Sequence, residues 1–242
     1  MKDIGRELMK LFKDSFQLRE SLCTVITDKP EAIQTAKDSI NNHRSTLQEY
    51  IKNHPRFSQS LEPVPVPKAP LVATLMAEVA EKANVGPMAA VAGVLADLAV
   101  NKMLSDGCKV AVVENGGEIS AVSNITIDVA VSAGDEPLSK RFGFRLSEFP
   151  IGVATSSGRF SHAFSFGDAE VATIFCKNAG LADAAATAVC NTVKGVNYQA
   201  AIQAGIDKAL SIQGVEGVLI IFKGFTGTAG KIPEIIKVDP TI

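Results

Sequence analysis

An acid and a hydroxyl stand four residues apart in a stretch of the chain that is otherwise small and apolar, residues 180–188. If this stretch is a helix, the carboxylate of Asp183 and the hydroxyl of Thr187 lie one above the other on the same face. Two convergent oxygens with little bulk around them suit a hard cation such as Mg2+. The spacing therefore makes Asp183 and Thr187 candidate magnesium ligands.

The same two residues also have purely structural interpretations. An aspartate in the first turn of a helix complements the macrodipole or caps free N–H groups. A threonine inside a helix can bond back to the carbonyl four residues earlier. The spacing alone leaves these interpretations of Asp183 and Thr187 open.

Three polar segments that contain glycine stand at expected strand or helix ends, and they are residues 86–88, 114–118 and 154–162. The third segment is the best candidate for an anion or phosphate site, because it combines four hydroxyls with a glycine, Arg159 and His162. Its structural alternative is a solvated serine-rich loop. His162 has no evident nucleophilic partner in the sequence, and neither a P-loop nor a GxGxxG pattern is present.

The elements that must position these residues can be read from periodicity. Helices are predicted over residues 30–54, 70–84, 86–105, 180–194 and 198–211, with helical character also over 3–14. Strands are predicted over residues 16–27, 110–113, 119–122, 124–132, 141–146, 151–155, 170–176, 215–222 and 232–238. A stiff polyproline-type connector covers residues 62–67, and an Asn-Gly turn at Asn115 predicts a hairpin.

This order of elements predicts an α+β fold, because the strands come in successive pairs instead of strict βαβ alternation. We expect one domain over residues 1–242, with two intimate subdomains, about 1–106 and 107–242, as the alternative.

Composition excludes several classes of function. A net charge of −2 gives no electrostatic reason to expect nucleic acid or an anionic membrane. Asp97 and Lys102 interrupt the richest apolar run, and the charged start of the chain is unlike a secretory signal, so a cytoplasmic protein is expected. The four cysteines have no CxxC pairing, which argues against a zinc ribbon.

Four blocks of sequence resemble the ApbE superfamily, the flavin transferases that attach FMN to proteins using FAD and Mg2+. The blocks follow the order of the superfamily, and they are residues 85–93 with Asp97, residues 113–119, residues 152–158 with Ser161 and His162, and residues 182–188. The whole chain is similar to the ApbE-like branch called uncharacterised protein family 0280. The resemblance implies an ApbE-like α+β fold with mixed or antiparallel sheets and helices packed between and on them.

The resemblance also assigns roles to residues. It implies that Asp183 and Thr187 hold Mg2+ together with a backbone carbonyl near the start of the helix predicted over 86–105. It implies that a flavin or nucleotide lies against the glycine turn and the serine-rich loop, with His162 as the catalytic candidate. The residues implied to bind this cofactor are Gly86, Asn115, Gly116, Gly117, Thr155, Ser156, Ser157, Gly158 and Arg159.

Two departures argue against FMN transfer itself. The lysine of the transferases falls at Ala92, which removes a cationic contact to the nucleotide. Their Asp-Pro run after the histidine is replaced by residues 163–167, Ala-Phe-Ser-Phe-Gly, which removes a partner that orients or handles a proton. The expected function is therefore Mg2+-dependent binding of a phosphate-bearing nucleotide or flavin, with a small-molecule ligand and a homodimer as the expected partners.

Two other functions remain open. The resemblance also implies a link to sulfur amino acid synthesis. A sulfur-handling accessory protein needs a reactive thiol, for which Cys176 and Cys190 are the candidates. A non-catalytic scaffold is the third hypothesis, since a shared fold does not establish an activity.

Overall fold

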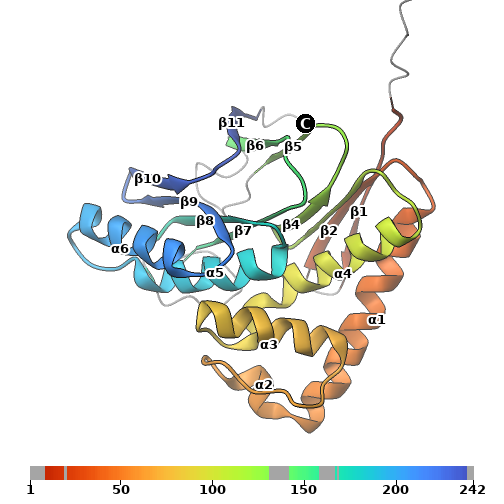
Figure 1. Ribbon diagram of the computed structural model, residues 1–242, viewed down its shortest axis with the longest axis horizontal. Helices are drawn as coiled ribbons and strands as arrows, with labels where there is room; N and C mark the ends of the chain where they lie inside the picture. Colours follow the sequence, from red (N-terminus) through yellow and green to blue (C-terminus); the bar gives the residue numbers. More distant parts are fainter. Residues whose placement is uncertain (1–8, 19–20, 131–141, 158–166, 168, 239–242) are drawn as a thin grey trace, which may run out of the picture.

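The fold is built on two antiparallel sheets, with helices on one face of the larger sheet and the smaller sheet on the other (Figure 1). The computed structural model describes residues 9–18, 21–130, 142–157, 167 and 169–238. All strand pairs in this part of the chain are antiparallel, which confirms the α+β class.

The larger sheet has eight strands, and it joins strands from both halves of the chain. Their spatial order is β1 (Phe12–Leu18), β2 (Ser21–Thr27), β3 (Ala111–Asn115), β4 (Glu118–Val122), β7 (Ile151–Ser156), β8 (Val171–Cys176), β9 (Val215–Phe222) and β10 (Phe225–Gly230). The smaller sheet has the order β11 (Glu234–Lys237), β6 (Phe142–Leu146) and β5 (Ile127–Ala130).

The helices form two layers below the larger sheet in Figure 1. Helices α1 (Ala32–Asn53), α4 (Val91–Ser105), α5 (Ala179–Thr192) and α6 (Tyr198–Ser211) contact the sheet directly. Helices α2 (Pro55–Gln59) and α3 (Leu71–Ala83) lie farther out, and the 3-10 turn η1 (Pro87–Ala90) leads into α4.

Alternation along the central strands sends side chains to two separate cores. On β7, Val153 joins the core between the two sheets, whereas Ala154 joins the core beneath the helices. The same alternation applies on β4, where Ile119 faces the smaller sheet and Ser120 bonds to helix α4. Polar side chains on the helix-facing positions therefore meet α4 and α5.

Helix α4 with its leading turn, Pro87–Ser105, is long and apolar enough to cross a membrane, but half of that segment is buried inside the protein. It packs against α1, α5, β3 and β4. We therefore interpret it as a core helix.

Two strands depart from the sequence prediction. The helical character expected up to residue 14 is wrong from Phe12 onward, because β1 pairs with β2 as a hairpin. Strand β10 was not predicted, and it follows a two-residue turn in which Lys223 and Gly224 both have positive φ.

Candidate functional site

Helices α4 and α5 cap each other with half-buried aspartates. The N-terminal N–H groups of a helix lack intrahelical partners, so they need an acceptor from elsewhere. Asp97 of α4 accepts from the first two N–H groups of α5, those of Ala179 at 2.9 Å and Gly180 at 2.8 Å. It also accepts from the hydroxyl of Ser120 on β4 at 2.6 Å. One carboxylate therefore joins α4, α5 and β4.

Asp183 of α5 performs the reciprocal task for α4. Its Oδ2 atom accepts from the N–H of Gly93 at 3.0 Å, and the N–H of Ala92 also donates to this carboxylate. Asp183 is thus a cap, as one structural interpretation held, but it caps the neighbouring helix. The absence of a side chain at Gly93 permits this approach, because a methyl group there would meet the carbonyl of Ala179.

The hairpin between β3 and β4 bonds to the peptide unit between Ala92 and Gly93 from the carbonyl side. Asn115 is 2% exposed and its Nδ2 donates to the carbonyl of Ala92 at 3.0 Å, while its Oδ1 accepts from the thiol of Cys23 at 3.3 Å. The peptide between Ala92 and Gly93 is therefore bonded to Asn115 through its C=O and to Asp183 through its N–H.

The predicted hairpin is confirmed, with Gly116 and Gly117 as its two central residues. Their φ angles are 72° and 115°. A two-residue hairpin turn that matches the twist of its strands needs positive φ at its central residues, and glycine adopts positive φ without strain. Asn115 and Glu118 are the paired residues that close the turn.

Glu118 is a second acid at this place. It lies in the polar segment 114–118, but it was not among the residues predicted to bind a metal or cofactor. Burial, followed by the negative charge of Asp183, holds the pKa of Glu118 well above its ordinary range. Burial likewise raises the pKa of Asp183 to about 7, against the opposing effect of its bonds from Gly93 and Ala92. Both side chains retain some contact with solvent. The sequence signal that could have identified Glu118 is an acidic residue directly after the two glycines of the turn.

The serine-rich segment divides between the two faces of β7. The hydroxyl of Thr155 lies 2.9 Å from that of Thr173 on the face toward the smaller sheet. Ser156 takes the helix-facing position, where it is 6% exposed and, within the described part of the chain, its hydroxyl has no hydrogen-bond partner. Ser157 follows at 5% exposed. Of these predicted residues, Ser156 is the one placed by alternation on the side of Asp183.

Thr187 follows Asp183 by one helical turn, as predicted, and it is 9% exposed. Within the part of the chain that the structure describes, its hydroxyl has no hydrogen bond, so the alternative in which it bonds back along its own helix is not realised. Asp183 and Thr187 lie on α5, which packs against α4 and against β4 and β7, the strands that carry Glu118 and Ser156.

Comparison with known proteins identifies the family. The family model described as "AbpE bacteria" matches residues 13–224. A UPF0280 protein of Methanococcus vannielii is 38% identical over 236 residues, covering 96% of this chain and 95% of its own length. A UPF0280 protein of Methanosarcina acetivorans is 39% identical over 230 residues, covering 94% and 90%. This chain belongs to the ApbE-like UPF0280 family.

Solved structures support the fold of this UPF0280 member. The apo flavinyl transferase ApbE of Pseudomonas stutzeri aligns with a TM-score of 0.59 at 13% identity, covering 91% of this chain and 94% of its own. The ApbE protein of Thermotoga maritima aligns with a TM-score of 0.56 at 12% identity, covering 95% and 97%. At this identity the likeness shows a shared fold.

Several predicted residues do not join the described site of this UPF0280 member. Gly158, Arg159 and His162 lie outside the described residues. Gly86 precedes η1, and its Cα faces the carbonyl of Ser60, so close packing against the backbone of Ser60 and Leu61 accounts for this glycine.

The thiols do not favour sulfur chemistry. All four cysteines of this UPF0280 member are buried, and none of them forms a disulfide. Burial raises the pKa of Cys23 to about 11 and the pKa of Cys176 to about 12. A persulfide carrier needs an accessible thiol with a lowered pKa. Cys176 and Cys190, the two candidates, are each fully buried.

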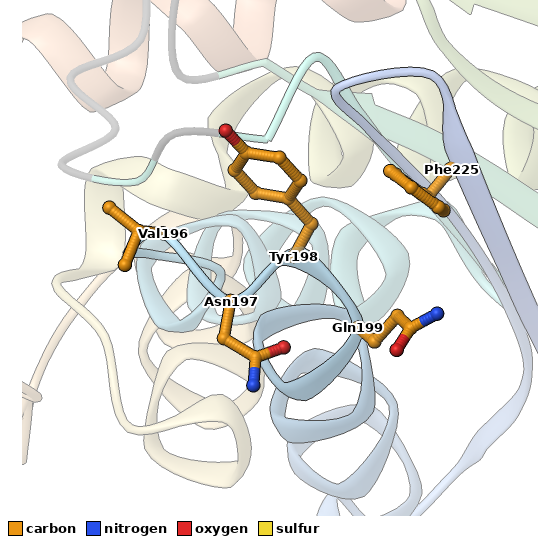
Figure 2. A pocket seen from close by; sticks show the side chains of 5 residues that line it. All are labelled: Val196, Asn197, Tyr198, Gln199 and Phe225. Atoms are coloured by element: carbon orange, nitrogen blue, oxygen red, sulfur yellow. The ribbon is translucent and has the colours of Figure 1, made fainter.

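The hollow at the start of α6 is a separate feature (Figure 2). Its volume is about 450 Å3, and its lining residues are Val196, Asn197, Tyr198, Gln199 and Phe225. None of these side chains is a carboxylate, imidazole, thiol or basic group. The candidate site is therefore assigned to the start of α4.

Proposed function

We propose that this chain binds a phosphate-bearing nucleotide or flavin together with Mg2+ at the start of α4. The observation that carries the proposal is the meeting of a desolvated Asp183 with the first N–H groups of α4. On the helix-facing side of β7, a strand that packs against α5, the buried Ser156 hydroxyl has no hydrogen-bond partner among the described residues. A buried polar group without a partner is rare in a folded protein, and a ligand atom is one way to satisfy it.

The two predicted metal ligands are of the chemical type that Mg2+ binds. Asp183 supplies a carboxylate and Thr187 a hydroxyl, and oxygen ligands are those that Mg2+ prefers. Among the described residues, no group of three or more His, Cys, Asp or Glu side chains is placed to hold a metal, so the site is unlike a zinc centre. When bound, Mg2+ supplies neutralisation of phosphate charge.

The glycine turn and Ser156 suit a phosphate-bearing ligand that binds the same cation. The glycine turn at Gly116 and Gly117 presents backbone without side-chain bulk, which lets a ligand approach closely. The Ser156 hydroxyl is free to donate to a phosphate or ribose oxygen. The Ala92–Gly93 peptide stays fixed because Asn115 and Asp183 bond to its two ends.

The comparisons support this proposal through the family and the fold. The aligned structure from Pseudomonas stutzeri is named as a flavinyl transferase, so FAD is the first ligand to test. We propose binding and not FMN transfer, because Ala92 occupies the position of the transferase lysine.

The test is a calorimetric titration of the full chain with FAD and with ADP, in Mg2+ and in EDTA. We expect binding in Mg2+ and a loss of at least about tenfold in affinity in EDTA or in Asp183→Asn, since a charge at a shared cation contributes more than this. Thr187→Val and Ser156→Ala should weaken binding less. Asp207→Asn removes an exposed acid on α6 and serves as the control. Equal affinity in Mg2+ and EDTA would remove the metal from the proposal.

A further inference from the structure

Strand β10 is an open edge of the larger sheet. It stands last in the strand order and pairs with β9 on one side alone (Figure 1). The N–H of Lys231, directly after β10, donates to the carbonyl of Glu216 at 2.7 Å, beside the start of β9. Because bonded and non-bonded positions alternate along an antiparallel pair, the peptide groups of Thr226 and Thr228 point outward. Among the described residues, no backbone bond reaches these outward groups.

A second bond gives the same orientation. Ile221 of β9 lies opposite Thr226, and its carbonyl accepts from the N–H of Glu170 at 3.0 Å on the β8 side. The peptide groups of Ile221 therefore face away from β10, and those of Thr226 face away from β9.

Alternation sends the side chains of β10 to two faces. A Cβ atom at Gly227 would meet helix α6, so Phe225 and Ala229 also lie on the helix face. Thr226 and Thr228 lie on the opposite face and are exposed. Phe225 is 47% exposed and lines the hollow shown in Figure 2. The open edge thus carries an aromatic ring that the chain itself covers only in part.

The two edges of the larger sheet differ in their protection. Exposed edge strands pair with other chains unless charges, proline or bulges prevent it. The other edge, β1, carries Lys13 and Asp14, and Asp14 pairs with Lys37 at 2.8 Å. Strand β10 reads Phe-Thr-Gly-Thr-Ala-Gly, without a charge or a proline, and its register with β9 has no shift. The β10 edge is therefore open to a further strand.

A second copy of β10 complements this edge. Pairing about a two-fold axis is antiparallel, and residues with outward peptide groups must pair with one another. With Gly227 on the axis, Thr226 of each copy exchanges backbone bonds with Thr228 of the other, and their side chains become cross-strand neighbours. Phe225 then lies opposite Ala229 and diagonal to Gly227 of the second copy, where small residues leave room for its ring.

This register keeps the contact within the regular part of β10. Gly230 has a φ of 71°, which ends the extended strand. The register brings Lys223 of one copy opposite Lys231 of the other, beyond the two ends of the strand. Lys231 is already ion-paired with Glu148, which reduces the repulsion between these lysines.

We propose that this chain forms a two-fold dimer through β10, in which the eight-stranded sheets of two copies join into one continuous sheet. This gives the expected homodimer a specific interface. The interface uses no residue of the site at the start of α4, so its test is independent of the proposed function.

The experiment is sedimentation equilibrium of the full chain, with two double variants of the same positions. In Thr226→Lys/Thr228→Lys, a lysine meets a lysine at both cross-strand pairs of the proposed register. In Thr226→Lys/Thr228→Glu, a lysine meets a glutamate at both pairs. The control Ser15→Lys/Gln17→Lys places two lysines at exposed positions of the other edge, β1. Thermal melting followed by circular dichroism establishes that each variant is folded.

We expect wild type, the β1 control and Thr226→Lys/Thr228→Glu to sediment at twice the mass of one chain. The dimer dissociation constant of Thr226→Lys/Thr228→Lys should rise at least about tenfold, because two like-charged pairs replace two threonine pairs.

Three results would overturn the inference. A monomeric wild type is the first, and it tests the proposal even if a variant does not fold; it would leave the edge to an extended peptide of another protein. Equal dissociation constants for the two β10 variants would show that these positions do not face each other. Loss of the dimer in the β1 control would place the interface at the other edge.

Discussion

The substitution Asp97→Asn tests whether one half-buried carboxylate holds α4, α5 and β4 together. Asp97 accepts three hydrogen bonds, and an amide of the same shape offers one oxygen and directs an NH2 group at one of the donors. A buried donor without an acceptor costs about 1–3 kcal/mol. Loss of the negative charge at the start of α5 costs about 0.3–1 kcal/mol more.

One effect opposes this loss. Burial raises the pKa of Asp97 because the ionised carboxylate is less well solvated in the folded protein. A neutral amide at this position avoids that desolvation cost. We therefore expect a net destabilisation of about 2 kcal/mol, or a fall in melting temperature of about 4–8 °C for a chain of this size. Urea denaturation and scanning calorimetry measure the two quantities.

Ser120→Ala is the matched control for Asp97→Asn, because it removes one of the three bonds and leaves the cap of α5 intact. It should cost about 1 kcal/mol. Stability of Asp97→Asn within about 0.5 kcal/mol of wild type would refute the reasoning, since surface-like substitutions fall in that range.

Three further predictions concern the same region. Gly93→Ala should destabilise the protein by about 1–3 kcal/mol in urea denaturation, although alanine has the higher helix propensity. The added methyl group would lie 2.8 Å from the nitrogen of Gly180 and would also meet the Ala179 carbonyl. A stabilised variant would disprove this close approach of the two helices. In EDTA, the free energy of unfolding of wild type should fall relative to that of Asp183→Asn as the pH rises from about 4 to about 7. The reason is that Asp183 keeps its proton in the folded state, whereas in the unfolded state it releases the proton near pH 3.8. A constant difference between the two proteins in denaturation curves at these pH values would contradict the raised pKa. All four thiols should react slowly with a thiol reagent in the native protein, and one fast thiol would reopen the sulfur-handling hypothesis.

Periodicity and turn chemistry predicted most of the fold. The helices and central strands follow apolar patterns, and the Gly-Gly turn fixes the β3–β4 hairpin. Strand β10 escaped because Phe-Thr-Gly-Thr-Ala-Gly has little apolar alternation, and its pairing depends on α6, whose Ile202 covers Gly227. The first residues of β1, up to residue 14, were given helical character because Asp14 takes a half-buried position where strand alternation leads one to expect an apolar residue, although burial alternates strictly along the strand.

The candidate site was predictable in part. The i,i+4 spacing placed Asp183 and Thr187 one turn apart on one helix, and this depends on local geometry alone. The cap that Asp183 provides to α4 spans 90 positions of sequence, and the approach of Glu118 to it depends on strand register. Such contacts arise from tertiary packing, so no local pattern contains them. The split of Thr155 and Ser156 to opposite faces follows from strand alternation once β7 is placed.

The most direct test of the central proposal is a thermal-shift titration of metal-free protein with FAD, FMN and ADP, each with and without Mg2+. A ligand that binds the folded state raises its stability by mass action, by about 2.7 kcal/mol at a hundred times the dissociation constant. The account predicts a rise in melting temperature with FAD that needs Mg2+ and disappears in Asp183→Asn. No rise with any of the three ligands in Mg2+ would contradict it.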